Sequence, residues 1–190
     1  METVEAIQGR RSIRRFKADL VPRDVIERLL DLTIRAPSAK NGQPWRFVVT
    51  TGEAKSRLVE TLQEVLEETK SKGQPTGSLQ GSIQAMAEAP VVILVFNRLS
   101  REDIPEPYAY AKLLVDTQSL GAAIQTFLLA AQDMGLGTLW ICDVLYARCE
   151  VQAFASTKEE LMAAIALGIP AETPGERPRQ DWRELSTWME

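Results

Sequence analysis

One tract near the middle of the chain is apolar on almost every side of the helix it should form. Residues 119–131, SLGAAIQTFLLAA, lie inside a predicted helix from Tyr108 to Met134, which Gly135 closes as a left-handed C-cap. A helix on the surface of a monomer keeps a polar face, so this tract must be covered on more than one side. We expect it to pack between a sheet and a second surface, for which the same helix of another copy of the chain is one candidate.

The remaining apolar runs predict a sheet. PVVILVF, from Pro90 to Phe96, is apolar on both faces, as is typical of a central strand. Further strands are predicted at 46–51, 137–142 and 162–169. Helices are predicted at 2–8, 22–36, 53–71, 83–87 and 143–155, and an acidic loop with prolines at 100–107. Because strands and helices interleave, we predict an α+β fold with a mixed sheet of four or five strands, flanked by helices.

The chain divides into a folded body, residues 1–170, and an extension, residues 171–190. The extension is polar and rich in proline, with an apolar end. It cannot build a core of its own, so it either stays disordered or lies along another surface, and its tryptophans favour docking. Within the body, residues 72–82, KGQPTGSLQGS, look the most flexible and are a candidate lid.

Charge and composition exclude several classes of function. The net charge of −4 disfavours a dominant role in binding nucleic acid or an anionic membrane. The chain has no histidine, which removes His-based triads, the common zinc sites and imidazole acid–base chemistry. We therefore expect no metal site, and if the chain is an enzyme, a cofactor should carry the chemistry.

Cysteine usage and the amino terminus favour a cytoplasmic protein. Cys142 and Cys149 form no metal-ligand pattern, and we expect them to be reduced thiols. The opening residues, METVEAIQGRR, show no signal peptide. The uncharged apolar tract at 117–132 is shorter than the ~20 apolar residues of a bilayer span, so it should be a buried helix.

Four arginines crowd the segment RRSIRRF, from Arg10 to Phe16. A guanidinium group pairs bidentately with a phosphate and stays charged, and the Ser12 hydroxyl can add a contact. Taken alone, the run is more simply a solvated basic corner at the end of a helix. In an acidic chain, a functional basic cluster should suit one small anion rather than a polyanion.

Three stretches, in order and at comparable separations, resemble the nitroreductase family of FMN-dependent oxidoreductases. They are RRSIRRF, PSAKNGQPW at 37–45, and GLGTLWIC at 135–142. The resemblance covers nearly the whole chain, including the RPR of the tail. It implies that the mixed sheet of four to five strands is mainly antiparallel. It also implies a homodimer with two FMN sites, each at the subunit interface, and a C-terminal arm that wraps the partner subunit.

The resemblance also implies roles for particular residues. The FMN phosphate and the pyrimidine end of the ring would be held by Arg10, Arg11, Ser12 and Arg14. The residues that would reach the flavin from the other subunit are Pro37, Ser38, Ala39 and Asn41. The main chain that would lie against the flavin, with an amide donating to N5, is that of Trp140, Ile141 and Cys142. The basic pair that would return to the phosphate is Arg177 and Arg179.

Other positions fall outside this set. Arg15 lies outside the family pattern and is a candidate surface charge. Trp140 could equally be a core residue, and Gln43 and Trp45 a packing corner. The positions where this chain departs from its relatives, and where a flavin contact is not expected to carry over, are Gly81, Gln84 and Thr126.

The implied activity is a ping-pong reaction. NADH or NADPH would reduce tightly bound FMN at N5 and leave, and a nitroaromatic, a quinone or a similar flat electrophile would then be reduced, with no side chain as catalytic acid. The same fold also hosts dehalogenases and enoate reductases, so the fold does not settle the reaction. A flavin-binding or sensing protein with little turnover, and an anion-binding module without flavin, are alternatives from other classes.

Overall fold

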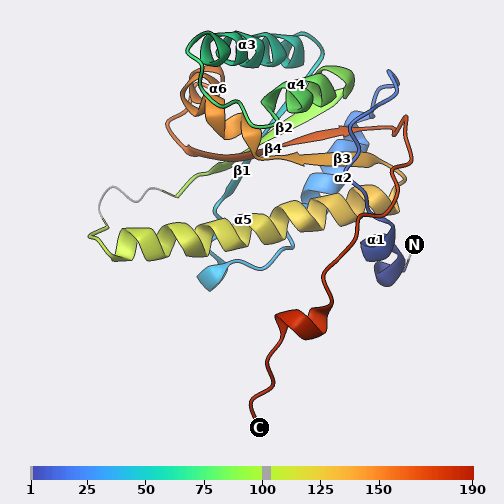
Figure 1. The fold of residues 1–190 in the computed structure, drawn as a ribbon, viewed down its shortest axis with the longest axis vertical. Helices are drawn as coiled ribbons and strands as arrows, with labels where there is room; N and C mark the ends of the chain where they lie inside the picture. Colours follow the sequence, from blue (N-terminus) through green and yellow to red (C-terminus); the bar gives the residue numbers. More distant parts are fainter. Residues whose placement is uncertain (1, 100–103) are drawn as a thin grey trace.

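The computed structural model describes residues 2–99 and 104–190 (Figure 1). The helices are α1 (Thr3–Gly9), α2 (Arg23–Thr33), α3 (Gly52–Ser71), α4 (Leu79–Glu88), α5 (Tyr108–Asp133) and α6 (Arg148–Phe154). The strands are β1 (Trp45–Thr51), β2 (Val91–Asn97), β3 (Gly137–Ile141) and β4 (Glu160–Gly168). Three short 3₁₀ turns are η1 (Ala39–Asn41), η2 (Asp143–Ala147) and η3 (Trp182–Leu185). Part of the loop predicted at 100–107 lies outside the described residues.

The strands form one antiparallel sheet in the order β1-β2-β4-β3. The predicted α+β class is therefore confirmed, and the four named strands pair without any parallel neighbour. β2 and β4 occupy the centre, and their register places Val91 opposite Leu167. β1 and β3 are the edge strands, and the amino-terminal segment adds an isolated parallel bridge from Ser12 to Thr138 beside β3.

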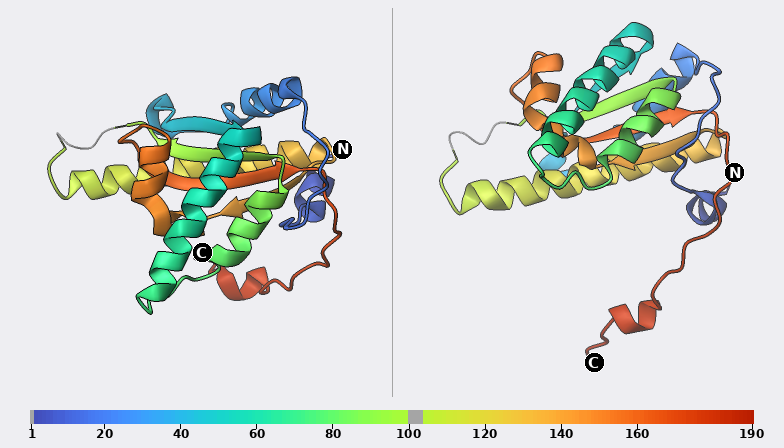
Figure 2. Two further views of the ribbon diagram at one scale, coloured as in Figure 1. Left: turned by 90° about the horizontal axis from the view of Figure 1, so that it is seen from above. Right: turned by 45° about the horizontal axis from the view of Figure 1, so that its top comes forward.

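The alternation of side chains along β2 separates two hydrophobic cores. Val92, Leu94 and Phe96 face α3, α4 and α6, whereas Val91, Ile93 and Val95 face α2 and α5. Both faces of β2 are fully covered, which is why its sequence is apolar from Val91 to Phe96. Figure 2 shows α3, α4 and α6 crossing one face of the sheet, with α5 behind the other.

Helix α5 confirms the predicted long apolar helix, but a single chain covers only one side of it. Leu120, Ile124 and Phe127 are buried against the sheet and α2, and each such side chain contributes about 1.5–3 kcal/mol. Leu114 and Gln125, on other sides, remain exposed. The whole of α5 is long and apolar enough to cross a bilayer, whereas the uncharged tract at 117–132 alone is predicted to be too short. Its packing on the sheet instead makes it a core helix of a soluble fold.

The predicted flexible segment at 72–82 is shorter in the structure. Its last four residues, 79–82, begin α4, where Leu79 and Ser82 are buried. The earlier start has a physical reason: Leu79 joins Ile83 and Met86 in packing against the sheet, so burial extends the helix by one turn toward the amino terminus.

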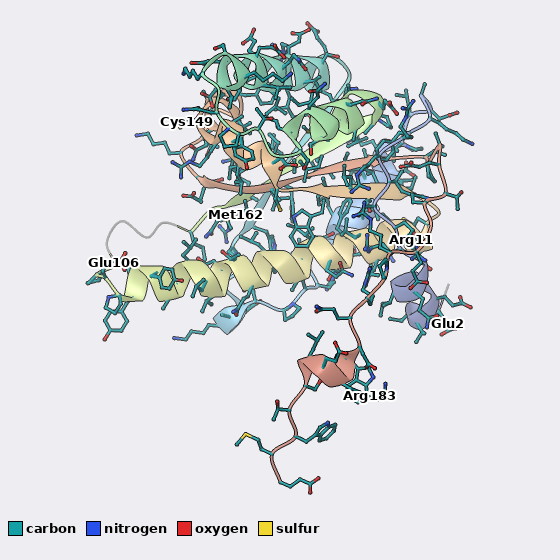
Figure 3. The ribbon with its side chains drawn as sticks, in the orientation of Figure 1. Glu2, Arg11, Glu106, Cys149, Met162 and Arg183 are labelled. Atoms are coloured by element: carbon teal, nitrogen blue, oxygen red, sulfur yellow. The ribbon has the colours of Figure 1, made fainter. Side chains whose placement is uncertain are left out.

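The carboxyl-terminal extension leaves the body as an arm (Figure 1; Figure 2, right). Its apolar side chains are uncovered in one chain: Trp188 is 80% exposed and Met189 95%. Figure 3 places Arg183 on this arm, well away from the sheet, while Arg11 lies close to the point where the arm departs. The arm thus presents an apolar end that the chain itself does not cover.

Candidate functional site

The segment that follows α1 lies along the outer edge of β3. The Ile13 amide donates to the Thr138 carbonyl at 2.9 Å, and Ser12 bridges Thr138 in parallel. A Cβ atom on Gly137 would come within 2.9 Å of the Ile13 side chain, so glycine permits this close approach. The motifs RRSIRRF and GLGTLWIC are therefore brought together, although the bridged residues Ser12 and Thr138 are 126 positions apart in the chain.

The beginning of the arm is attached to the same segment. The Lys17 backbone amide donates to the Ile169 carbonyl, and the Ala171 amide donates to the Arg15 carbonyl, both at 2.9 Å. The Glu172 carboxylate accepts from the backbone amides of Arg14 and Arg15. These bonds hold the first residues of the tail beside the arginines of the segment from Arg10 to Phe16.

Arginines from both ends of the chain meet at this place, where Arg10, Arg11 and Arg179 form the arginine cluster. Burial lowers the pKa of the Arg10 guanidinium, and the positive charges of Arg179 and Arg11 lower it further. Arg11 donates to the Gln8 and Arg10 carbonyls, Arg14 to the Ser12 carbonyl, and Arg179 to the carbonyl of Arg177. Like charges held close together in this way would be stabilised by a bound anion.

Arg15 behaves differently, as its place outside the family pattern suggests. Its Nε lies 3.0 Å from the Glu88 carboxylate, which also accepts from the Phe16 amide. Arg15 is thus used in an ion pair with α4, and it provides an internal control for the arginines of the cluster.

The end of β3 presents one aromatic ring and one thiol. Trp140 is 39% exposed, and its ring lies 3.9 Å from the position of a Cβ atom on Gly121 of α5. Ile141 points into the core on the other face of the sheet, which α3, α4 and α6 cover. Cys142 is an exposed residue whose thiol is nevertheless partly shielded from water. This partial burial and the Asp143 charge raise the pKa of the thiol, and a hydrogen bond with Trp140 opposes that shift.

Asp143 connects the end of β3 to the start of α4, a contact that sequence reasoning missed. Its Oδ2 accepts from Ser78 Oγ at 2.6 Å and from Ser82 Oγ at 2.8 Å. The Tyr146 ring packs against Gly77, whose φ of +54° favours glycine. The signal available in the sequence was the i, i+4 spacing of the two serines, which places both hydroxyls on one face of a helix.

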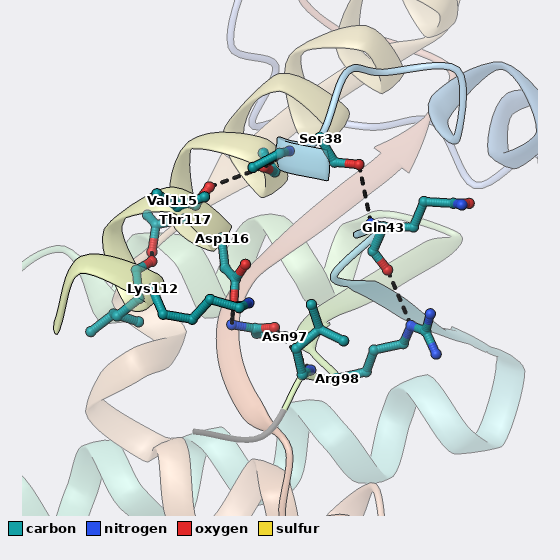
Figure 4. A network of polar contacts seen from close by, with 12 residues as sticks. Ser38, Gln43, Asn97, Arg98, Lys112, Val115, Asp116 and Thr117 are labelled. Carbon is teal, nitrogen blue, oxygen red and sulfur yellow. Dashed lines mark hydrogen bonds and ion pairs between the residues drawn. The ribbon is translucent and has the colours of Figure 1, made fainter. Parts of the chain in front are cut away.

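The loop around η1 is held in an unusual backbone conformation (Figure 4). Lys40, Asn41 and Gln43 all have positive φ, at 52°, 54° and 46°. Ser38 Oγ accepts from the Gln43 amide at 3.1 Å, and Ser119 Oγ of α5 lies 3.4 Å from the Ala39 amide. Non-glycine residues in this region are strained, and such strain persists where the surrounding structure enforces it.

The η1 loop and the arginine cluster lie at different places along α5. The loop contacts Ser119, whereas Gly9, next to the cluster, approaches Gln132. Positions 119 and 132 are separated by about 20 Å at the rise of an α-helix. A single chain therefore does not bring Pro37, Ser38, Ala39 and Asn41 to the arginines.

The sequence departures fall on other surfaces. Gly81 and Gln84 are exposed residues of α4, and Thr126 turns its hydroxyl back to the Ala122 carbonyl. Of the predicted corner, Trp45 is buried in the α5 core and Gln43 is exposed, with its backbone bonded to Ser38 and Arg98.

Comparison with known proteins finds similar sequences and a similar fold. A profile described as the nitroreductase family matches residues 7–169. A protein of Methanothermobacter thermautotrophicus, provisionally named for NADH dehydrogenase and NAD(P)H nitroreductase activity, is 33% identical over 93% of this chain and 82% of its own length. The iodotyrosine deiodinase of Thermotoga neapolitana is 27% identical over 90% of both chains. A Desulfovibrio desulfuricans protein solved in complex with FMN has a TM-score of 0.75 at 30% identity, covering 100% of this chain and 98% of that one.

Proposed function

The chain belongs to the nitroreductase family, and we propose that it is an FMN-dependent oxidoreductase that transfers electrons from NAD(P)H to a flat electrophilic acceptor such as a nitroaromatic compound or a quinone. The observation that carries the proposal is the arginine cluster beside β3. Arg10 lies close to Arg11 and Arg179, and the repulsion among them matches a site for a dianionic phosphate.

The chain's own residues would bind and orient the cofactor. Arg10, Arg11, Ser12 and Arg14 would hold the FMN phosphate and the pyrimidine end, with Arg177 and Arg179 approaching from the arm. The main chain from Trp140 to Cys142 would lie along the ring. When bound, FMN supplies the hydride chemistry, while the protein excludes water and aligns the reacting groups.

The distance between the two parts of the site supports a homodimer. Because the η1 loop lies about 20 Å from the arginine cluster along α5, one flavin would take the cluster from one copy and Pro37, Ser38, Ala39 and Asn41 from the other. The open side of α5 and the uncovered arm, residues 171–190, would then pack on the partner. We assign the protein to the cytoplasm.

The visible spectrum of the purified protein tests the proposal. We expect a yellow protein whose flavin absorbance bleaches on anaerobic addition of NADH or NADPH and returns when a quinone or a nitroaromatic compound is added. A protein that stays colourless after incubation with FMN would refute the cofactor assignment. Flavin that binds but is not reduced would instead favour a sensor.

Reductive dehalogenation is the second candidate, because the deiodinase relative matches over nearly the full length of both chains. The two reactions differ in their products. Halide release from an iodinated phenol by the reduced protein would favour the dehalogenase, and its absence alongside rapid quinone reduction would favour the first proposal.

A further inference from the structure

Asp116 is a buried acid that lies outside the arginine cluster. It is 4% exposed and sits on α5 one turn before Ser119. Its Oδ2 accepts from Asn97 Nδ2 at 3.2 Å and forms an ion pair with Lys112 (Figure 4). Removing a carboxylate from water is costly unless partners compensate for it. Asn97 and Lys112 provide that compensation, so the buried carboxylate holds both of these residues in place.

The partners of Asp116 lead directly to the η1 loop. Asn97 Oδ1 accepts from the Leu99 amide at 3.1 Å, which orders the turn after β2. In that turn, the Arg98 amide donates to the Pro44 carbonyl at 2.8 Å and Arg98 Nε to the Gln43 carbonyl at 3.1 Å. Asp116 is thus connected through Asn97 and Arg98 to the carboxyl-terminal end of the loop.

A second connection reaches the other end of the loop and the space beside it. Ser119 Oγ faces the Ala39 amide, and the Leu99 side chain lies 3.7 Å from the position of a Cβ atom on Gly42. These residues line a cavity of about 540 Å³ together with Asp116, Lys112 and Lys40. Two residues of α5, Asp116 and Ser119, therefore contact opposite ends of the loop, Asp116 through Asn97 and Ser119 directly.

We propose that Asp116 is a positioning residue, which holds the strained loop from Ser38 to Gln43 in the conformation that receives the flavin of a second copy. The inference rests on the proposed function. The loop carries three positive-φ residues, a conformation that free loops seldom adopt. The Asp116 network constrains the carboxyl-terminal end of the loop and Ser119 the other end, so FMN meets a preorganised loop and avoids the cost of ordering it.

Titration of FMN into the full-length protein stripped of flavin tests the proposal, with thermal unfolding measured on each variant. For Asp116→Ala we expect the Kd of FMN to rise about tenfold or more, the equivalent of one lost charge-assisted hydrogen bond. Asp116→Asn keeps an oxygen acceptor for Asn97, so it should recover most of the affinity. Thr50→Val is the matched control, since it removes a buried hydroxyl bonded to the Val92 carbonyl at a distant site.

Ser119→Ala provides a variant that leaves no buried charge unpaired, and we expect it to weaken FMN binding by about threefold through the loop amide alone. If Asp116→Ala does not fold, Ser119→Ala decides whether these buried contacts position the loop. Unchanged FMN affinity in Asp116→Ala or in Ser119→Ala, or an equal loss in Thr50→Val, would overturn the positioning role while leaving the proposed function intact. Failure of the wild-type protein to bind FMN would instead overturn the proposed function.

Discussion

Replacing Arg10 with alanine should weaken FMN binding without weakening the protein itself. Arg10 is half-buried and lies close to Arg11 and Arg179, whose charges lower its pKa. Without an anion, its removal relieves repulsion, so the free energy of unfolding of the flavin-free protein should stay the same or rise. With FMN, the loss of a contact to a charged group costs about 1.5–3 kcal/mol. The Kd should therefore increase about 10- to 150-fold.

The assay is a flavin fluorescence titration, repeated with riboflavin, which lacks the phosphate. Arg10→Ala should reduce the affinity for FMN and leave that for riboflavin nearly unchanged, because the lost contact is to the phosphate. Arg15→Ala is the control, because it removes the same charge five residues along the chain, from an ion pair with Glu88. We expect its Kd for FMN to equal that of the wild type.

Two results would contradict this reasoning. An unchanged Kd for FMN in Arg10→Ala would show that the arginine cluster does not bind the FMN phosphate. Equal losses in Arg10→Ala and Arg15→Ala would indicate a general effect of net charge instead of a local site. Thermal unfolding provides an independent measure, since the stabilisation by a ligand grows with its concentration relative to Kd, and the increase in Tm on adding FMN should shrink in Arg10→Ala.

Three further predictions concern neighbouring contacts. Gly137→Ala should lower the free energy of unfolding by about 1–3 kcal/mol, because its Cβ would overlap Ile13; urea denaturation with no change would show that the amino-terminal segment is not held against β3. The raised pKa of Cys142 predicts that alkylation of its thiol requires a higher pH than alkylation of a free thiol. It also predicts that the contribution of Cys142 to the free energy of unfolding is complete below the pKa of a free thiol and is lost as the pH rises through the pKa of the folded protein. Cys142→Ser should abolish that alkaline loss in pH-dependent unfolding. Deleting residues 175–190 should weaken both dimer and FMN affinity, measured by sedimentation velocity and flavin titration, and loss of only one would contradict the role of the arm.

Local patterns in the sequence determined most of the elements. The apolar run from Pro90 to Phe96 predicts a strand covered on both faces, and β2 is such a strand. The helix predicted at 108–134 ends as expected beside Gly135, whose φ is +73°. These predictions succeed because period, capping and burial depend on neighbours only a few residues apart. The motifs also indicated both the arginine segment and strand β3, which lies beside it in the structure.

Tertiary structure decided how distant groups meet. The family resemblance implied that Arg179 returns to the phosphate site of Arg10, but no local pattern places Asp143 between Ser78 and Ser82 at the start of α4, or Asp116 on the path to the η1 loop. These contacts join segments that only the antiparallel order of the sheet and the course of α5 bring together, so their energies do not appear in any window of sequence. The same holds for the separation of the loop from the arginines, which depends on where each segment crosses a helix about 39 Å long.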